Sequence, residues 1–324
     1  MALTIETILK DPVVQALNPK GKRFLEARWL SPKLNPGAAY GLDVAALVVR
    51  LFPHIKAPAT FQMMLEDFEA GRYRGMHTIV VPSSGNTAHA VARLAPAFGF
   101  TDVKVVLASD VPESKKGILA ALSSVYLIEV PKGKSTADEA EKIAQAPGHY
   151  LLDQYGHAGN VRAHELYTGP ESLRACDFNL DIVAIGMGSG GTVTGVSRYL
   201  KQQLPGSFVI GVRPVSGERV PGNRDKAQMD AVVTLPYQEA VDVVMEGSRK
   251  DSFIMMRRLW TEVEPQPGPS SALPLVGLKN WLSTLPASKL KQLEGKRAAF
   301  ICPDDGRFYS ERTTGELDPD QGLS

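Results

Sequence analysis

From residue 77 onward, short β-rich runs alternate along the chain with longer runs patterned as helices. The short runs are almost continuously apolar, which is typical of parallel strands buried on both faces of a sheet. Strand–helix–strand alternation of this kind predicts a doubly wound α/β fold. The expected strands cover 77–83, 103–109, 125–130, 181–188, 208–215 and 297–305, and the expected helices cover 87–98, 112–123, 135–146 and 192–204.

A helical stretch at 159–176 separates the first three of these strands from the later ones. We interpret it as the hinge between two lobes, each a mainly parallel sheet flanked by helices. The smaller lobe is predicted at 43–153, and the larger lobe combines 1–42 with 154–324. In two-lobed α/β proteins a ligand commonly binds between the lobes, beyond the carboxyl ends of the strands.

The composition narrows the class of ligand. Of the 324 residues, 44% are hydrophobic and 22% charged, and the net charge is only +1, so nothing favours nucleic acid or an anionic membrane. Six scattered histidines without an H-x-x-x-H spacing predict no metal site. The first residues lack a signal-peptide pattern, no apolar stretch is long enough to cross a bilayer, and Cys176 and Cys302 are solitary. We therefore expect a cytoplasmic protein with reduced thiols that binds a small molecule.

The segment GMGSGGTVTG, at 186–195, joins an expected strand to an expected helix. Its glycines allow close approach of the backbone, and the N–H groups and dipole at a helix start favour an anion. We predict a phosphate-binding loop made of Gly188, Ser189, Gly190, Gly191 and Thr192. The segment also fits the dinucleotide pattern G-x-G-x-x-G, and Arg213 on the next expected strand would suit a 2′-phosphate, so an NADP-dependent oxidoreductase remains an alternative.

Three further sites carry polar side chains at positions that suit a ligand. PSSGNTAHAVA, at 82–92, clusters hydroxyls and an amide at a helix start, where they can bind a carboxylate or simply cap the helix. Gln154 precedes the hinge helix, and Ser270 opens a later helix in PGPSSALPLVGL. Each has an ordinary structural explanation when considered alone.

Taken in order, these segments resemble the cysteine synthase family of fold type II pyridoxal-phosphate (PLP) enzymes, which includes O-acetylserine sulfhydrylase and cystathionine β-synthase and has a tryptophan synthase β-like architecture. The resemblance extends over about 30–305 and is carried by Asn35-Pro36-Gly37, SSGNT, DQYGHAGN, HELYTGPE, GMGSGGTVTGVSRYLK and PSSA. It implies a homodimer that binds an amino acid and PLP. The implied substrate-binding residues are Ser83, Ser84, Gly85, Thr87 and Gln154. The implied cofactor-binding residues are Asn86 at the 3-hydroxyl, the loop from Gly188 to Thr192 at the phosphate, and Ser270 at the pyridine nitrogen.

The family pattern NPGGSVKDR contains the lysine that forms a Schiff base with PLP and then moves the Cα proton. The corresponding text here is NPGAAYGLDVAA, which we interpret as a turn at 35–37 followed by an apolar helix. Alignment from the turn puts Gly41 at the lysine position, and alignment on the aspartate puts Leu42 there. Neither alignment supplies an amine.

Other lysines are candidates for the missing amine. Lys33 lies across the turn and is considered first, ahead of Lys22 and Lys56. Losing the lysine would remove covalent anchoring together with general acid–base catalysis, which alone contributes ~10²–10⁴-fold.

Three hypotheses for the function follow. In the first, the chain is a cysteine synthase-like protein whose β-replacement chemistry is altered or lost. It binds PLP non-covalently, a PLP–amino acid adduct or another phosphorylated small molecule, and it either catalyses another reaction or regulates a synthase as a protein partner. In the second, it is an active PLP-dependent lyase or transferase that acts on an activated serine with a displaced lysine. The third is the NADP-dependent oxidoreductase.

Overall fold

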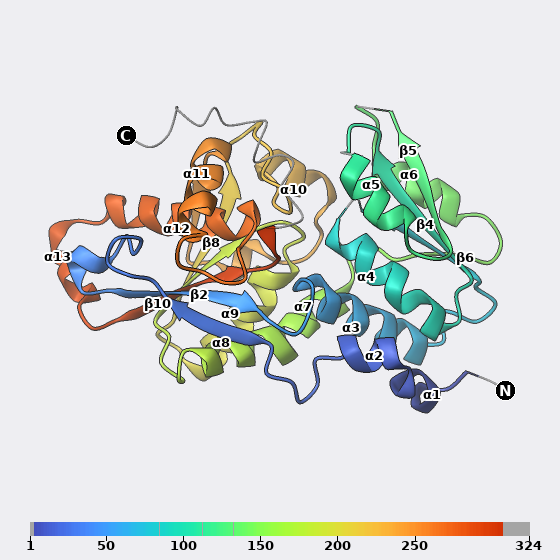
Figure 1. The fold of residues 1–324 in the computed structure, drawn as a ribbon, viewed down its shortest axis with the longest axis horizontal. Helices are drawn as coiled ribbons and strands as arrows, with labels where there is room; N and C mark the ends of the chain where they lie inside the picture. Colours follow the sequence, from blue (N-terminus) through green and yellow to red (C-terminus); the bar gives the residue numbers. More distant parts are fainter. Residues whose placement is uncertain (1–2, 84, 112, 132, 307–324) are drawn as a thin grey trace. The chain divides into compact units, whose positions relative to one another are not determined.

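The computed structural model describes residues 3–83, 85–111, 113–131 and 133–306. They form two compact units (Figure 1). Unit 1 contains the chain up to Lys20 together with Lys56–Ala163, and unit 2 contains Gly21–Ile55 together with the chain from His164 onward. Ser84, one of the predicted carboxylate-binding residues, lies outside the described residues.

These units differ from the predicted lobes in the N-terminal part of the chain, at 43–55 and in the segment before residue 21. The sequence assigns 43–55 to the smaller lobe, whereas the structure joins it to unit 2, because residues 43–49 form a strand of that unit's sheet. The first 20 residues, assigned to the larger lobe, belong to unit 1. There α2 (Pro12–Leu17), which follows α1 (Ile5–Lys10), contacts α3 and α4.

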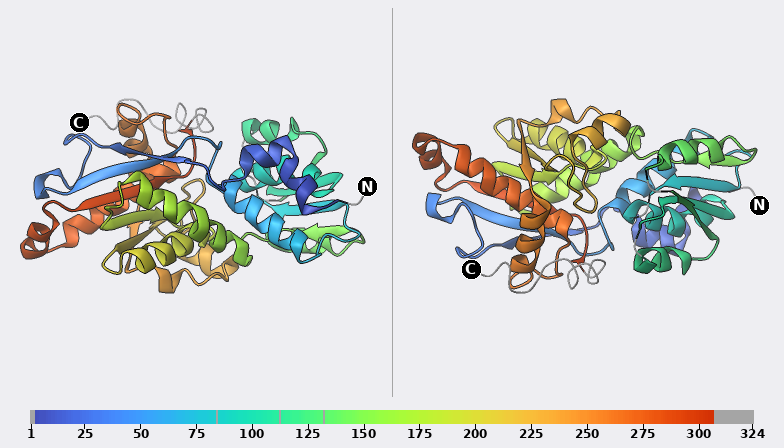
Figure 2. Two further views of the ribbon diagram at one scale, coloured as in Figure 1. Left: turned by 90° about the horizontal axis from the view of Figure 1, so that it is seen from below. Right: turned by 90° about the horizontal axis from the view of Figure 1, so that it is seen from above.

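Unit 2 is built on a six-stranded sheet with the order β1-β2-β10-β7-β8-β9. β1 is antiparallel to β2, and every other neighbouring pair is parallel. Figure 2 shows the blue β1 and β2 beside the red β10. The strands are β1 (Leu25–Trp29), β2 (Asp43–Val49), β7 (Ile182–Gly186), β8 (Phe208–Pro214), β9 (Val243–Gly247) and β10 (Arg297–Cys302).

The strand β2 corrects one prediction. The sequence predicted an apolar helix after the turn at 35–37, but the structure has a short 3-10 helix at Ala38–Tyr40 and then β2. The segment is a strand because β1 and β10 supply backbone partners on both sides of it. Its valines also suit a strand.

Helices cover unit 2's sheet, and its inner strands are largely buried, whereas the outer strands β1 and β9 are only partly buried. α12 (Pro269–Thr284) contacts β7, β8, β9 and β10, and α11 (Arg249–Leu259) packs on α12. α9 (Gly191–Gln203) contacts β7 and packs on α8 (Gly169–Ala175), which contacts β1. Along β2, every residue from Val44 to Val49 is buried, although successive side chains point to opposite faces. The unit also contains a π-helical turn at His164–Thr168, α10 (Lys226–Val232), α13 (Ala287–Leu290) and 3-10 turns at Gln238–Ala240 and Lys291–Leu293.

Unit 1 is built on a four-stranded, fully parallel sheet with the order β5-β4-β3-β6. Val80, Val106, Val130 and Ala140 form its apolar core between the sheet and α6. The strands are β3 (Thr78–Pro82), β4 (Asp102–Ala108), β5 (Val125–Val130) and β6 (His149–Leu151). The helices are α3 (Lys56–Glu69), α4 (Asn86–Leu94), α5 (Glu113–Ala120), α6 (Thr136–Ala144) and α7 (Ala158–Ala163), with a 3-10 turn at Ala95–Phe98.

The two sheets flanked by helices confirm the predicted α/β class. Within the described part of the chain, no helix is both long enough and apolar enough to span a membrane.

Candidate functional site

Most of the predicted site residues of unit 2 lie at one edge of its sheet. β2, β10 and β7 are parallel neighbours, so their carboxyl ends lie at the same edge. The glycine-rich loop follows β7, Asp304 follows β10, and residues 50–55 follow β2. Ligands of open α/β sheets bind at this kind of edge.

The glycine-rich loop is packed so closely against a neighbouring turn that a side chain is excluded at two of its positions, Gly186 and Gly188. A Cβ on Gly188 would lie 2.3 Å from the carbonyl oxygen of Gly222, and one on Gly186 would lie 2.5 Å from Oδ1 of Asn223. The Arg224 N–H donates to the Met187 carbonyl at 2.9 Å, which fixes the two segments together. The bare backbone of the loop can therefore approach a ligand closely.

The loop ends at the start of α9, whose first N–H groups have no partner within the helix. Gly190 makes the turn into this helix with φ of +82°, a conformation that favours glycine. Ser189 is buried at the turn. Backbone donors and the helix dipole at this helix start suit an anion such as a phosphate, which is what the sequence predicted for these residues.

Thr192 is held by a histidine from the adjacent π-helical turn. Its Oγ1 lies 3.0 Å from His164 Nε2, and Thr168 Oγ1 lies 2.9 Å from His164 Nδ1. His164 and Thr168 are fully buried. In the tautomer that carries its proton on Nε2, His164 donates to Thr192, and the hydroxyl hydrogen of Thr192 is left to donate to an anion.

Ser270 is buried at the start of α12, and its hydroxyl donates to Oδ1 of Asp304 at 2.9 Å. Asp304 pairs through a β-bridge with His54, and the Ile55 N–H donates to the Pro303 carbonyl at 2.8 Å. The segment that follows β2 is thereby attached to the segment that carries Asp304, and Asp304 in turn accepts from Ser270 of α12. Lys56, the next residue along the chain, begins α3.

The turn at 35–37 occupies the opposite edge of the sheet. Trp29, the last residue of β1, pairs with Ala45 near the start of β2, so the connection between these strands lies at the amino end of β2. The Gly295 N–H donates to the carbonyl of Gly41 just before β10 begins, which places Gly41 there too. Lys33 is an exposed residue of the same connection. The turn is therefore not part of the edge that bears the glycine-rich loop, and the residues that follow it say nothing about the lysine of the site.

Lys56, which alignment on Asn35-Pro36-Gly37 placed behind Lys33, is the lysine that directly follows the segment after β2. The signal that could have found it is Ile55-Lys56, which matches the Val-Lys of the family pattern once the alignment is moved beyond β2. Ala57 and Pro58 stand where that pattern has aspartate and arginine, and this departure hides the match.

Unit 1 brings together the residues predicted to bind a carboxylate. The Thr87 hydroxyl donates to Oε1 of Gln154 at 2.8 Å, and both side chains are buried. The Gly85 N–H donates to Oγ of Ser83 at 3.3 Å, and Asn86 begins α4 directly after Gly85. The start of α4 thus offers hydroxyls, an amide and helix N–H groups, which suit a carboxylate.

The loop that carries Gln154 is fixed by Asn160, which is fully buried. Asn160 Nδ2 donates to the Gln154 carbonyl at 2.7 Å, and the Asn160 N–H donates to the His157 carbonyl at 3.0 Å. The described residues contain no group of three or more histidine, cysteine or acidic side chains placed to hold a metal ion.

These donor sets fit PLP and an amino acid. The glycine loop of unit 2 suits a phosphate, Ser270 supplies a hydroxyl for a ring nitrogen, and the start of α4 in unit 1 suits a carboxylate. Arg213, the residue that favoured NADP, is instead paired with Glu246 at 3.0 Å.

Comparison with known proteins agrees with this chemistry. A family model described as "Pyridoxal-phosphate dependent enzyme" matches residues 56–304, and the match begins at Lys56. Cystathionine beta-synthase of Dictyostelium discoideum is 30% identical over 264 residues, which are 76% of this chain and 51% of that protein. Cysteine synthase B of Escherichia coli is 26% identical over 270 residues, 83% of this chain and 86% of that protein. The chain spans about half the length of the cystathionine beta-synthases that it matches.

Solved structures share the fold. O-ureido-L-serine synthase superposes with a TM-score of 0.78 and 20% identity, covering 94% of this chain and 96% of that chain. The O-acetylserine dependent cystathionine beta-synthase from Helicobacter pylori gives a TM-score of 0.75 with 24% identity, covering 96% and 98%.

Proposed function

We propose that this chain, which belongs to the pyridoxal-phosphate dependent enzyme family and is homologous to cystathionine beta-synthase and cysteine synthase B, is an active enzyme that uses Lys56 for elimination or replacement at Cβ of an activated serine. O-acetylserine and O-phosphoserine are substrates of the right chemistry. The proposal takes the second of the three hypotheses, with a different lysine from the one considered first.

The observation that supports it most is the path of the chain after β2. This segment leaves the sheet at the edge that bears the glycine-rich loop, is joined to Asp304 through His54, and leads directly into Lys56. The hypothesis of lost chemistry rested on the absence of a lysine after the turn at 35–37. Because that turn lies at the opposite edge of the sheet, the absence no longer argues for lost chemistry.

The residues would divide the work as follows. The N–H groups of Gly188–Thr192 bind the phosphate. The Ser270 hydroxyl turns its hydrogen from Asp304 to the ring nitrogen, where a neutral donor favours chemistry at Cβ over transamination. Thr87 and Gln154 bind the carboxylate of the amino acid. PLP, when bound, withdraws electrons from Cα of the amino acid. The amine of Lys56 accepts the Cα proton and returns it.

The test uses borohydride, which fixes PLP to a lysine to which it is covalently bound. The purified protein is incubated with PLP and reduced with borohydride. Its intact mass is then measured, and the modified residue is located by peptide mapping. We expect one added PLP on the peptide that contains Lys56, loss of this adduct in Lys56→Ala, and an unchanged adduct in the matched control Lys33→Ala. An adduct that persists in Lys56→Ala would overturn the assignment.

If the wild-type protein forms no covalent adduct, the result would favour the first hypothesis, in which PLP or another phosphorylated molecule is held non-covalently. We further propose the family's homodimer, which light scattering of the purified protein would test. A monomer at working concentration would contradict it.

A further inference from the structure

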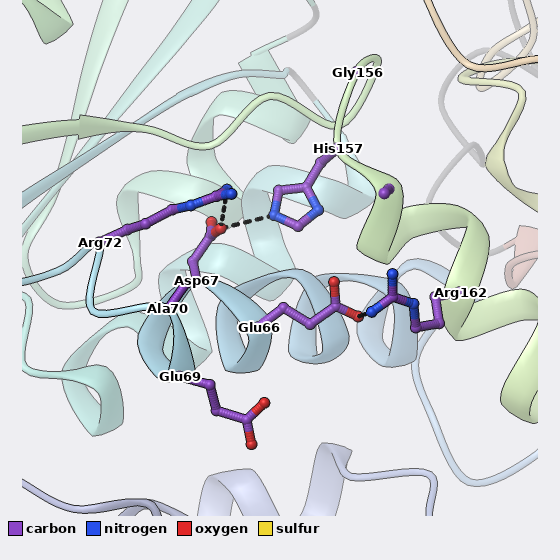
Figure 3. Close-up of a pocket in the computed structure, with 9 residues that line it drawn as sticks. Glu66, Asp67, Glu69, Ala70, Arg72, Gly156, His157 and Arg162 are labelled. Atoms are coloured by element: carbon purple, nitrogen blue, oxygen red, sulfur yellow. Dashed lines mark hydrogen bonds and ion pairs between the residues drawn. The ribbon is translucent and has the colours of Figure 1, made fainter.

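Asp67 is a buried carboxylate near the end of α3, and three donors from different segments of unit 1 converge on it (Figure 3 shows two of them). Its side chain is 1% exposed. Oδ1 accepts from Arg72 Nη1 at 2.7 Å and from His157 Nε2 at 2.9 Å, and Oδ2 accepts from the Tyr150 hydroxyl at 2.7 Å. Such a carboxylate fixes the positions of the groups that donate to it.

These contacts keep Asp67 ionised. Burial alone raises the pKa of the Asp67 carboxyl, but the hydrogen bonds from His157 and Tyr150 outweigh burial and lower the pKa below its ordinary value.

His157 connects Asp67 to the loop that carries Gln154. Its Nδ1 accepts the Gly159 N–H at 2.9 Å, so in the neutral ring Nε2 carries the proton and donates it toward Asp67. A Cβ on Gly159 would lie 2.9 Å from this ring and 3.0 Å from Glu66 Oε2. The ring therefore fills the space that a side chain at Gly159 would need, and the loop has little freedom there.

The loop at 153–160 is thus held from two sides. His157 binds Asp67 of α3, while Gln154 receives the Thr87 hydroxyl at the start of α4. Asn160 ties the two halves by bonding to the carbonyls of both Gln154 and His157. A displacement at His157 would therefore move Gln154.

A cleft of about 530 Å³ lies beside the Asp67–His157 pair, and two of its acidic side chains form ion pairs with arginines that also line it. Glu66 pairs with Arg162 at 3.3 Å, and Asp67 pairs with Arg72 (Figure 3). Arg162 lines the same cleft as Asp67 and His157, but in Figure 3 it contacts Glu66 and neither residue of the pair. A variant of Arg162 is therefore the matched control below.

We propose that Asp67 and His157 are positioning residues that set the amino-acid affinity of the enzyme by holding the Gln154 loop against α3. The inference rests on the proposed function, in which Gln154 binds the substrate carboxylate. α3 also begins with Lys56, so one helix would hold the proposed base at its start and the carboxylate loop near its end.

The experiment compares four variants of the PLP-loaded protein. Amino-acid binding is followed by the change in PLP absorbance on titration with O-acetyl-L-serine, and PLP affinity is measured separately. Asp67→Asn and His157→Leu should weaken amino-acid binding about tenfold while leaving PLP affinity within about threefold, because only the carboxylate loop is released. His157→Gln, which keeps an N–H donor for Asp67, should recover most of the affinity. Arg162→Gln should behave as wild type.

Equal amino-acid affinity in His157→Leu and the wild type would overturn the inference, and so would equal losses in His157→Leu and His157→Gln. A parallel loss of PLP affinity would mean that the pair only stabilises the fold, which also overturns it. If Asp67→Asn does not fold, the two His157 variants carry the test. Failure of the proposed function is distinct, since the wild type itself would then bind no PLP or give no response to the amino acid.

Discussion

Substitution of Gly188 by alanine tests the phosphate loop with a single methyl group. The added Cβ would lie 2.3 Å from the Gly222 carbonyl oxygen, whereas ordinary contacts of this kind begin at 3.4 Å. Because the obstacle is a backbone atom, the two segments must separate by about 1 Å. A misplacement of this size in the groups that position a bound molecule can reduce their effect by as much as ~10²-fold. We expect PLP affinity to fall about 10- to 100-fold and the free energy of unfolding to fall by about 1–3 kcal/mol, as for other overpacked sites.

The assay is a titration with PLP followed by absorbance, with thermal unfolding measured on the same samples. Gly206→Ala is the matched control, because a Cβ there meets nothing within 4 Å. Gly190→Asp would be a poorer test of the same loop, since Gly190 has φ of +82° and its Cβ would crowd Tyr237. A folded Gly188→Ala variant with wild-type PLP affinity would refute the placement of the phosphate.

Two further predictions concern pH and thiol chemistry. The lowered pKa of Asp67 means that its carboxylate stabilises the folded state at every pH above the ordinary carboxyl range and that this contribution is lost as pH falls through the lowered pKa. The loss of folded protein with falling pH, monitored by circular dichroism, should therefore be less steep in Asp67→Asn than in the wild type. The same pH dependence in both proteins would contradict this role of Asp67. Burial raises the pKa of the Cys176 thiol to about 12 and that of Cys302 above its ordinary value, so both should resist iodoacetamide at mildly alkaline pH until denaturant is added. Rapid labelling of the native protein, detected by mass, would contradict this burial.

The parts of the site that the sequence predicted differ in how far they are set by local structure. The glycine-rich loop was predictable because an apolar strand, a run of glycines and a helix start follow one another directly. Thr87 and Gln154 were both candidates for the same carboxylate, and the structure places them 2.8 Å apart. Only the glycine-rich loop could be identified from local sequence, because the contact between Thr87 and Gln154 joins segments 67 residues apart and their shared role was implied by the family resemblance.

The proposed base was placed behind Lys33 because its position depends on a distant strand. DVAALVV contains alanines and a leucine that suit a helix, and pairing with β1 and with the distant β10 makes it a strand. Once it is a strand, the chain must emerge at the edge that bears the phosphate loop, and Lys56 follows. The network around Asp67 was missed for the same reason, since Tyr150 and His157 are remote from it in sequence.

The position of β10 in the sheet also determines when unit 2 can fold. β10 is the last described strand of the chain, yet it lies between β2 and β7, with Asp43 pairing with Arg297. On the ribosome, β2 must therefore wait for the synthesis of Arg297–Cys302 before its inner edge is paired, while β7 also presents an open apolar edge. Pairings so distant in sequence are slow to form, and unpaired edges invite association with other chains. The growing chain would thus depend on chaperones until β10 has been synthesised.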